Sequence, residues 1–320
     1  MKKILISAAV VLMILSCQND STDSASPTIS AIAHRGCASQ EVLEAQMIAD
    51  PTLAIRMNEI EAFTQKTMSN SNFRLVNGKI VIPVVVNVLY RTAAENISDS
   101  QIQSQIDVLN KDFTATNSDF GSIPSFFSGV AANVDITFEF VKTVRKSTTK
   151  TSWGTRDAMK KSKSGGINPT DPTRNLNFWV CTIGGGILGY AQFPGGSSST
   201  DGVVCDSKYV GVTSNTGGAY PYNLGRTATH EVGHWMNLRH IWGDTTCGSD
   251  LVSDTPTHNT ANYGVPAYPH YSTCAGTPIE MTMNYMDYTD DRGMYMFTNG
   301  QKSRISAIFV SGGARAAFGI

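Results

Sequence analysis

Residues 230–240 read His-Glu-Val-Gly-His-Trp-Met-Asn-Leu-Arg-His and contain three of the six histidines in this 320-residue chain. On a helix, residues four apart share a face, so His230 and His234 can present two imidazole nitrogens to one metal ion. A zinc ion with nitrogen ligands and one open position lowers the pKa of a bound water toward about 7. Glu231 lies next to the first histidine and can take the proton of that water. The pattern therefore predicts a helix that carries a catalytic zinc site.

The third nitrogen ligand has to come from outside this helical face. His240 follows His234 by six residues, so the chain must turn after Asn237 to bring His240 back to the metal. A His-Glu-x-x-His pentamer also arises by chance on ordinary helices, but a further histidine at this offset makes chance a poor explanation. We therefore expect His230, His234 and His240 to bind zinc together.

The run resembles the long zinc signature of the metzincin metallopeptidases, His-Glu-x-x-His-x-x-Gly-x-x-His, and residues 229–235 look like the pappalysin branch of that family. Three further segments are similar to the family, and the resemblance covers roughly residues 75–312. They are Asp254-Thr255-Pro256, the Met-turn segment Asn284-Tyr285-Met286-Asp287-Tyr288, and the backing helix Ile102–Phe113. The resemblance implies that Glu231 is the general base and that Met286 lies beneath the metal. It also implies that the Tyr288 hydroxyl stabilises the tetrahedral intermediate.

One position departs from the family pattern. Asn237 stands where the metzincin signature has Gly, which is favoured because the backbone turns sharply there, often through positive φ. Asn tolerates that region best after Gly. We therefore expect the turn to survive and His240 to reach the metal.

The remaining pattern predicts an α+β fold. Strands are expected at 80–90, 133–141, 176–183 and 203–210, and Ser98 with Gln101 forms a capping-box pattern before the helix at 102–113. The resemblance implies a metzincin-type zincin, with an upper twisted mixed sheet, a backing helix and an active-site helix. It implies an irregular lower subdomain that ends in a helix near 301–310. Substrate would add a strand alongside the short segment 188–193.

The first residues have the layout of an export signal. Lys2 and Lys3 precede an apolar run over 4–15, which is shorter than the roughly 20 residues that a membrane-spanning helix needs. Residues 14–17, Ile-Leu-Ser-Cys, resemble the lipobox of bacterial lipoproteins, so residues 1–17 are expected to be a signal peptide with Cys17 as the lipidated residue. Ordinary cleavage that removes Cys17 is the alternative. Residues 18–28 form a polar tether.

Residues 29–75 form a separate, mostly helix-forming piece before the catalytic domain at 76–320. A thiolate is a strong zinc ligand, and Cys37 in Arg35-Gly36-Cys37 resembles the cysteine switch of metzincin propeptides. The piece is therefore expected to be an inhibitory prosegment, whereas a structural cysteine is the plainer alternative. Self-processing would occur before Lys66 or Arg74 if the enzyme prefers basic residues.

The other cysteines are interpreted through the same resemblance. Cys247 and Cys274 resemble a family disulfide that ties down the lower subdomain, and Cys181 with Cys205 is a less certain second bridge, because the two lie in strands that can be neighbours. The family often carries calcium, for which Asp254, with Asp244 and Asp250, offers oxygen ligands. Loop acids are more often simply solvated.

Family members of this kind favour cleavage before Lys or Arg, which requires an acid in the pocket for the residue after the scissile bond. Asp287, Asp290 and Asp291 lie near the Met-turn, and the sequence does not choose among them.

Composition and charge exclude some classes of function. A net charge of −1 without a basic tract argues against nucleic acid as a partner. We expect an exported zinc endopeptidase made as a latent precursor, found in the cell envelope as a lipoprotein or secreted. It would be a monomer that acts on proteins or peptides and meets membranes only through a lipid anchor. The alternative is a surface lipoprotein that binds a partner and keeps zinc for structure. Glu231 favours the enzyme, because a structural zinc does not need it.

Overall fold

The computed structural model describes residues 34–69, 80–214 and 218–318, so the predicted signal peptide, Cys17, the tether and Arg74 lie outside the described residues. The helices are α1 Ser39–Ala49, α2 Thr52–Met68, α3 Asp99–Phe113, α4 Ser125–Ser128, α5 Arg226–Trp235 and α6 Asn299–Ala307. The strands are β1 Ile80–Tyr90, β2 Ala131–Ala132, β3 Ile136–Ser147, β4 Leu176–Cys181, β5 Gly189–Ala191, β6 Val203–Asp206 and β7 Phe297–Thr298. Across these three described ranges, no helix is both long and apolar enough to cross a membrane.

Five strands form one mixed sheet in the order β3-β1-β4-β6-β5. β1 pairs in parallel with β3 and β4, and β4 pairs in parallel with β6, whereas β5 runs antiparallel to β6. β5 is therefore an edge strand, and its outer side can pair with another extended segment.

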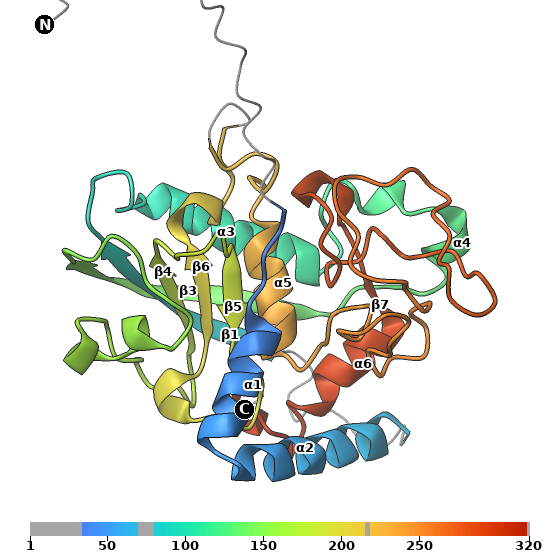
Figure 1. Cartoon of the computed structure of the whole chain (residues 1–320), viewed down its shortest axis with the longest axis horizontal. Helices are drawn as coiled ribbons and strands as arrows, with labels where there is room; N and C mark the ends of the chain where they lie inside the picture. Colours follow the sequence, from blue (N-terminus) through green and yellow to red (C-terminus); the bar gives the residue numbers. More distant parts are fainter. Residues whose placement is uncertain (1–33, 70–79, 215–217, 319–320) are drawn as a thin grey trace, which may run out of the picture. The chain divides into compact units, whose positions relative to one another are not determined.

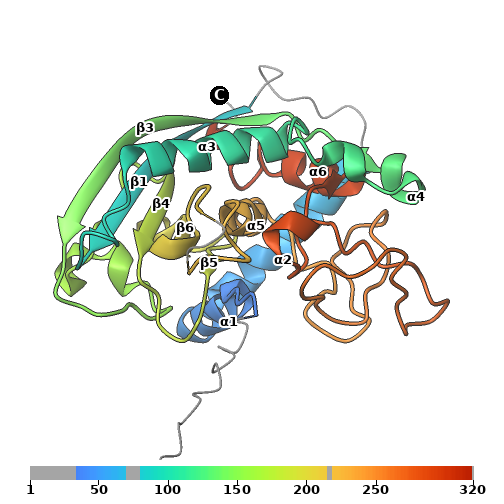
Figure 2. The ribbon, with the colours of Figure 1, turned by 90° about the horizontal axis from the view of Figure 1, so that it is seen from above.

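The largest hydrophobic core lies between one face of this sheet and helices α3 and α5. Figure 2 shows α3 running along the sheet beside β1 and β3. The hydroxyl of Ser98 accepts the backbone N–H of Gln101 at 3.1 Å, so the predicted capping residue does begin the backing helix. Packing against α3 and the sheet fixes the position of α5, which carries the zinc motif.

Three predicted strands have different ends in the structure, and β4 differs least, since it ends at Cys181 rather than at 183. β3 starts at Ile136 rather than at 133, because Asp135 has a φ of +64° that interrupts extended backbone, and it continues to Ser147. β6 ends at Asp206, whose carboxylate accepts the backbone N–H of Lys208 at 3.0 Å and starts a 3₁₀ turn. The second half of the predicted strand 203–210 is therefore wrong.

The predicted bridge between Cys181 and Cys205 is also wrong, since both cysteines are free. The strands that carry them are neighbours, but Cys205 pairs with Val180 and Cys181 pairs with Asp206. Because successive side chains alternate between the faces of a sheet, this offset of one residue puts the two sulfurs on opposite faces. Cys205 belongs to the core under α5, whereas Cys181 belongs to the core on the other side.

The lower part, residues 236–296, consists of turns, isolated bridges and a short 3₁₀ helix at Asp291–Gly293, and it leads into β7 and α6. A disulfide joins Cys247 to Cys274, as the family resemblance predicted. In Figure 1, α1 lies below the centre of the molecule and α2 runs along its lower edge, with α1 beside β5 and α2 beside α6. The two-part α+β architecture expected from the sequence is thus present.

Candidate active site

Helix α5 carries the zinc motif and is buried along its whole length. The carboxylate of Asp291 accepts the backbone N–H groups of Leu224 at 2.8 Å and Arg226 at 3.2 Å, which stabilises the start of the helix. α5 ends at Trp235, and Asn237 then adopts a φ of +73°. The turn expected at Asn237 is therefore present, and it returns His240 to the other two histidines.

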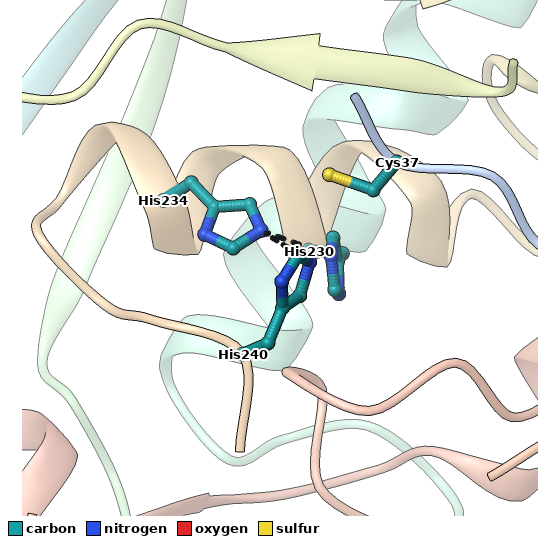
Figure 3. A group of neighbouring side chains, drawn as sticks. All are labelled: Cys37, His230, His234 and His240. Carbon is teal, nitrogen blue, oxygen red and sulfur yellow. Dashed lines mark hydrogen bonds between the residues drawn. The ribbon is translucent and has the colours of Figure 1, made fainter. Parts of the chain in front are cut away.

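Figure 3 shows three histidine rings that converge, with Cys37 facing them from another segment. The Nε2 atom of His234 lies 3.1 Å from that of His230 and 3.0 Å from that of His240. Two nitrogens bound to one tetrahedral zinc ion lie roughly 3.4 Å apart. Ligand atoms of Cys37 and the three histidines all lie within 4.8 Å of one another. The four donors therefore fit one metal ion, and nitrogen and sulfur are the donors that zinc prefers.

Each of the three rings is held by a hydrogen bond at its Nδ1 atom. The partners of His230, His234 and His240 are the carbonyl oxygens of Tyr285 and Leu238 and the carboxylate of Asp244, at 2.7, 2.9 and 2.5 Å. These bonds orient the rings and leave each Nε2 for the metal. Burial and the neighbouring histidines lower the pKa of His230 well below its usual range and that of His234 to about 3. Both rings are therefore neutral, which is the form that binds a metal.

Glu231 lies beside the histidines and is fully buried, and burial raises the pKa of its carboxyl to about 8. The hydroxyl of Ser39 donates to Glu231 Oε2 at 2.9 Å, and the thiol of Cys37 donates to the same oxygen at 3.4 Å. Gly189 on β5 makes room for this carboxylate, because a Cβ there would lie 2.9 Å from Glu231 Cγ. Ser39 was missed in the sequence, where its only signal is its place two residues after Cys37.

The Met-turn segment lies directly under α5. A Cβ at Gly233 would be 2.5 Å from Met286 Sδ, so the glycine allows the methionine to approach the helix. The ring of Tyr288 lies 5.6 Å from that of His230 and 4.9 Å from that of His240. The Tyr288 hydroxyl donates to the backbone carbonyl of Cys37 at 3.2 Å. Both predicted residues are therefore next to the metal-binding group.

The segment around Cys37 pairs with the edge strand. The N–H of Leu188 donates to the carbonyl of Gly36 at 2.8 Å, and the N–H of Ala38 donates to the carbonyl of Gly189 at 3.1 Å. This pairing is parallel to β5. The N-terminal piece thus occupies the sheet edge where the sequence placed the substrate.

Arg35 is the second residue of this segment that the sequence did not single out. It is buried, and its guanidinium donates to Asp291 Oδ1 at 2.5 Å and to the carbonyl of Thr289 at 3.2 Å. The ring of Tyr222 lies 4.8 Å from the guanidinium carbon. Of the three acids near the Met-turn, Asp291 is therefore the one whose carboxylate accepts a hydrogen bond from the buried Arg35 side chain.

The other acids have different surroundings. The carboxylate of Asp287 accepts the backbone N–H groups of Asn262 and Tyr288, both at 2.8 Å, and so holds the Met-turn itself. Asp254 accepts the hydroxyl of Thr298 at 2.6 Å and the N–H of Gly300 at 2.8 Å, at the start of α6. The prediction of calcium at Asp254 gains no support, because both of its oxygens bind groups of the protein.

Three histidines and a glutamate around a buried helix, with a methionine beneath them and a mixed sheet above, define a zinc peptidase of the metzincin type. The sequence profile of the pregnancy-associated plasma protein-A family, peptidase M43, matches residues 171–310. An extracellular metalloprotease of Pyricularia oryzae is 33% identical over 274 residues, which are 85% of this chain and 86% of that protein. The chain belongs to the peptidase M43 family of zinc metalloproteases, also called pappalysins.

Two solved structures are similar to this chain. A promirolysin variant from Tannerella forsythia is 39% identical, with 89% of this chain and 97% of that chain covered and a TM-score of 0.80. Mature mirolysin from the same organism, in complex with a cleaved peptide, is 42% identical, with coverages of 76% and 96% and a TM-score of 0.72. These matches confirm the predicted fold class. They also confirm the prediction of an enzyme over the alternative, a binding protein that keeps zinc for structure.

Proposed function

We propose that this chain is an exported endopeptidase in which His230, His234 and His240 hold the zinc and Glu231 is the general base. The convergence of three oriented Nε2 atoms beside one buried carboxylate is the observation that carries the assignment. When bound, zinc supplies the positive charge that makes water a nucleophile at neutral pH. Glu231 takes a proton from the attacking water and passes it to the leaving amine.

Two residues of the Met-turn segment, Tyr288 and Met286, also contribute to the active site. The Tyr288 hydroxyl donates to a backbone carbonyl of the N-terminal segment, at Cys37. Once that segment has left, the same hydroxyl can donate to the oxygen of a scissile peptide carbonyl, where negative charge develops. Met286 closes the floor of the site against Gly233.

The chain is made as a latent precursor in this proposal. The sulfur of Cys37 lies with the three histidines and takes the ligand position that water needs. The hydroxyl of Ser39 engages Glu231, and residues 36–38 cover the edge of β5. The N-terminal segment thus blocks three things at once: the ligand position that water needs, the general base Glu231, and the edge of β5 that would pair with the substrate. The related promirolysin structure supports a latent form.

The pocket at Asp291 selects Lys or Arg after the scissile bond. The N-terminal segment runs parallel to β5, whereas an antiparallel strand pairs slightly better with an edge. An antiparallel substrate runs in the opposite direction, so the pocket filled by Arg35, which precedes Cys37, receives a residue that follows the scissile bond. Asp291 then provides the negative charge for that residue.

Digestion of casein or a peptide library by the processed protein tests the assignment. We expect cleavage that is lost in Glu231→Ala while one zinc per chain remains bound, as measured by elemental analysis. Glu139→Ala, which removes an exposed carboxylate from β3, is the matched control and should keep activity. A zinc-loaded Glu231→Ala variant that cleaves as well as the wild type would contradict the role of Glu231.

The boundaries and location of the protein are also part of the proposal. Residues 1–17 direct export and Cys17 carries a lipid, residues 18–28 are a tether, 29–75 are removed, and 76–320 form a monomeric enzyme. Lys66 lies within α2, and a helical bond does not fit an extended cleft, so cleavage before Arg74 is favoured. N-terminal sequencing of the mature form, with mass spectrometry of the precursor for a lipid on Cys17, tests both points.

A further inference from the structure

A second, partly buried ion pair joins the removable segment to the catalytic part. The guanidinium of Arg304 on α6 donates to both carboxylate oxygens of Glu61 on α2, with Nη–Oε distances of 2.9 and 2.5 Å. The side chain of Arg304 is 1% exposed, whereas that of Glu61 is 23% exposed. Glu61 therefore reaches inward from the surface helix to a cation that belongs to the enzyme.

The catalytic part itself fixes the direction of this cation. The Nε atom of Arg304 donates to the backbone carbonyl of Asn237 at 2.7 Å. Asn237 is the residue that turns the chain between His234 and His240. The two Nη atoms consequently point toward α2 from a position set by the metal-binding loop.

A second cation lies on the same side. Burial alone would raise the pKa of Glu61, but the hydrogen bonds and charge of Arg304, together with the charge of Arg239, hold it below its usual range. Glu61 and the exposed Arg239 line one cavity of about 190 Å³ with Phe193 and Asn237. When α2 departs, these two arginines face solvent without the carboxylate that both attract, and an arginine cannot lose its charge.

The path of the prosegment shows which side of the scissile bond the Glu61–Arg304 ion pair occupies. The chain passes from Arg35 through Cys37 to α1 and then to α2, which lies beside α6 (Figure 1). Arg304 on α6 contacts Glu61 on α2, so it meets the prosegment at a point that follows Cys37 along the chain, whereas Asp291 meets it at Arg35, before Cys37. The Asp291 pocket takes the residue after the scissile bond in the proposed function. The surface at Arg304 then meets residues on the N-terminal side of that bond.

We propose that Arg304, assisted by Arg239, forms a subsite for a carboxylate side chain of the substrate on the N-terminal side of the scissile bond, which Glu61 fills in the precursor. The inference rests on the proposed peptidase function and on removal of α2. The ligand is an aspartate or glutamate in an extended peptide. A bidentate arginine–carboxylate pair has the geometry that such recognition uses.

Matched peptides test the subsite on the processed enzyme. Each pair shares one cleavable bond before Arg and differs only by Glu or Gln at one position, which is moved stepwise toward the N-terminus. We expect kcat/KM to be roughly tenfold higher for Glu at one or two neighbouring positions, with the difference mainly in KM. The ratio of kcat/KM for the Glu peptide to kcat/KM for the Gln peptide should fall to near one in the enzyme variant Arg304→Gln. It should fall partly in Arg239→Gln and Arg304→Lys.

Controls separate this subsite from folding and from the proposed function. Arg174→Gln removes an exposed arginine elsewhere and should leave the ratio unchanged. Zinc content of each variant reports on the metal loop, and Arg239→Gln gives the answer if Arg304→Gln does not fold. A ratio near one at every position in the wild type, or one that persists in the arginine variants, would overturn the subsite while cleavage continues. Failure to cleave even the Gln peptides would overturn it together with the peptidase function.

Discussion

The sharpest prediction concerns Asp291→Asn in the processed enzyme. Asp291 is fully buried, and its two oxygens have different tasks. Oδ2 accepts two backbone N–H groups at the start of α5, while Oδ1 faces the guanidinium of Arg35. The substitution keeps the size of the side chain and one oxygen but removes the negative charge. It therefore tests charge recognition in the pocket with little change of shape.

The size of the effect follows from burial. Both side chains of the Arg35–Asp291 pair are at most 2% exposed, so solvent screening does not reduce their interaction much. Breaking a buried pair by removing one partner costs about 3–5 kcal/mol, and the lower end applies because Asn keeps a hydrogen-bond acceptor. At 1.4 kcal/mol per tenfold change, about 3 kcal/mol corresponds to a roughly 100-fold loss.

The assay compares two peptides that differ only in Arg or its neutral analogue citrulline after the scissile bond. We expect kcat/KM for the Arg peptide to fall roughly 100-fold in Asp291→Asn, and that of the citrulline peptide to change little. Asp290→Asn is the control, because the hydrogen bond from the Arg35 guanidinium to a carboxylate goes to Asp291. An Arg preference that survives in Asp291→Asn would show that the charge of Asp291 does not recognise the basic side chain. An equal loss for both peptides would instead assign Asp291 to the support of α5 alone.

Three further predictions address latency and stability. Cys37→Ala in the full-length precursor should raise peptidase activity roughly tenfold or more before any cleavage of the chain, and a mutant that stays as latent as the wild type would exclude the switch. Replacing Cys247 and Cys274 by Ser should lower the free energy of unfolding by about 3–4 kcal/mol for a separation of 27 residues, as measured in urea, and an unchanged midpoint would contradict it. Burial raises the pKa of Asp250 to about 6, so its contribution to stability is complete below the unfolded pKa of about 4 and is lost as pH rises through 6. Asp250→Asn should therefore be about 2–3 kcal/mol more stable relative to wild type at pH 8 than at pH 4, and a difference that does not vary with pH would contradict the shift.

The sequence was sufficient wherever the signal is local. Residues 230–240 predicted the zinc helix, its turn and its three histidines, because ligand spacing on one helix is a property of a short segment. The strand at 80–90 and the cap at Ser98 were found for the same reason. Strand ends were harder, since a single left-handed residue such as Asp135 can decide where extended backbone begins.

Pairings between distant segments could not be predicted from one sequence. Arg35 and Asp291 are separated by 256 residues, and Glu61 and Arg304 by 243. Nothing local marks either arginine as buried, since arginine is usually found at the surface. The failed Cys181–Cys205 bridge has a related cause, because neighbouring strands were foreseeable but their register was not.

The two arginine–carboxylate pairs attach the prosegment through opposite charges. Arg35 brings a cation to Asp291 on one side of the zinc site, and Glu61 brings an anion to Arg304 on the other. Each charge left in the enzyme is buried and loses its partner when the segment departs, which is costly for both. A substrate with an acidic residue upstream and a basic residue directly after the scissile bond would restore both pairs at once. If both proposals hold, the two charges that bind the prosegment in the precursor are the same charges that select substrates in the processed enzyme.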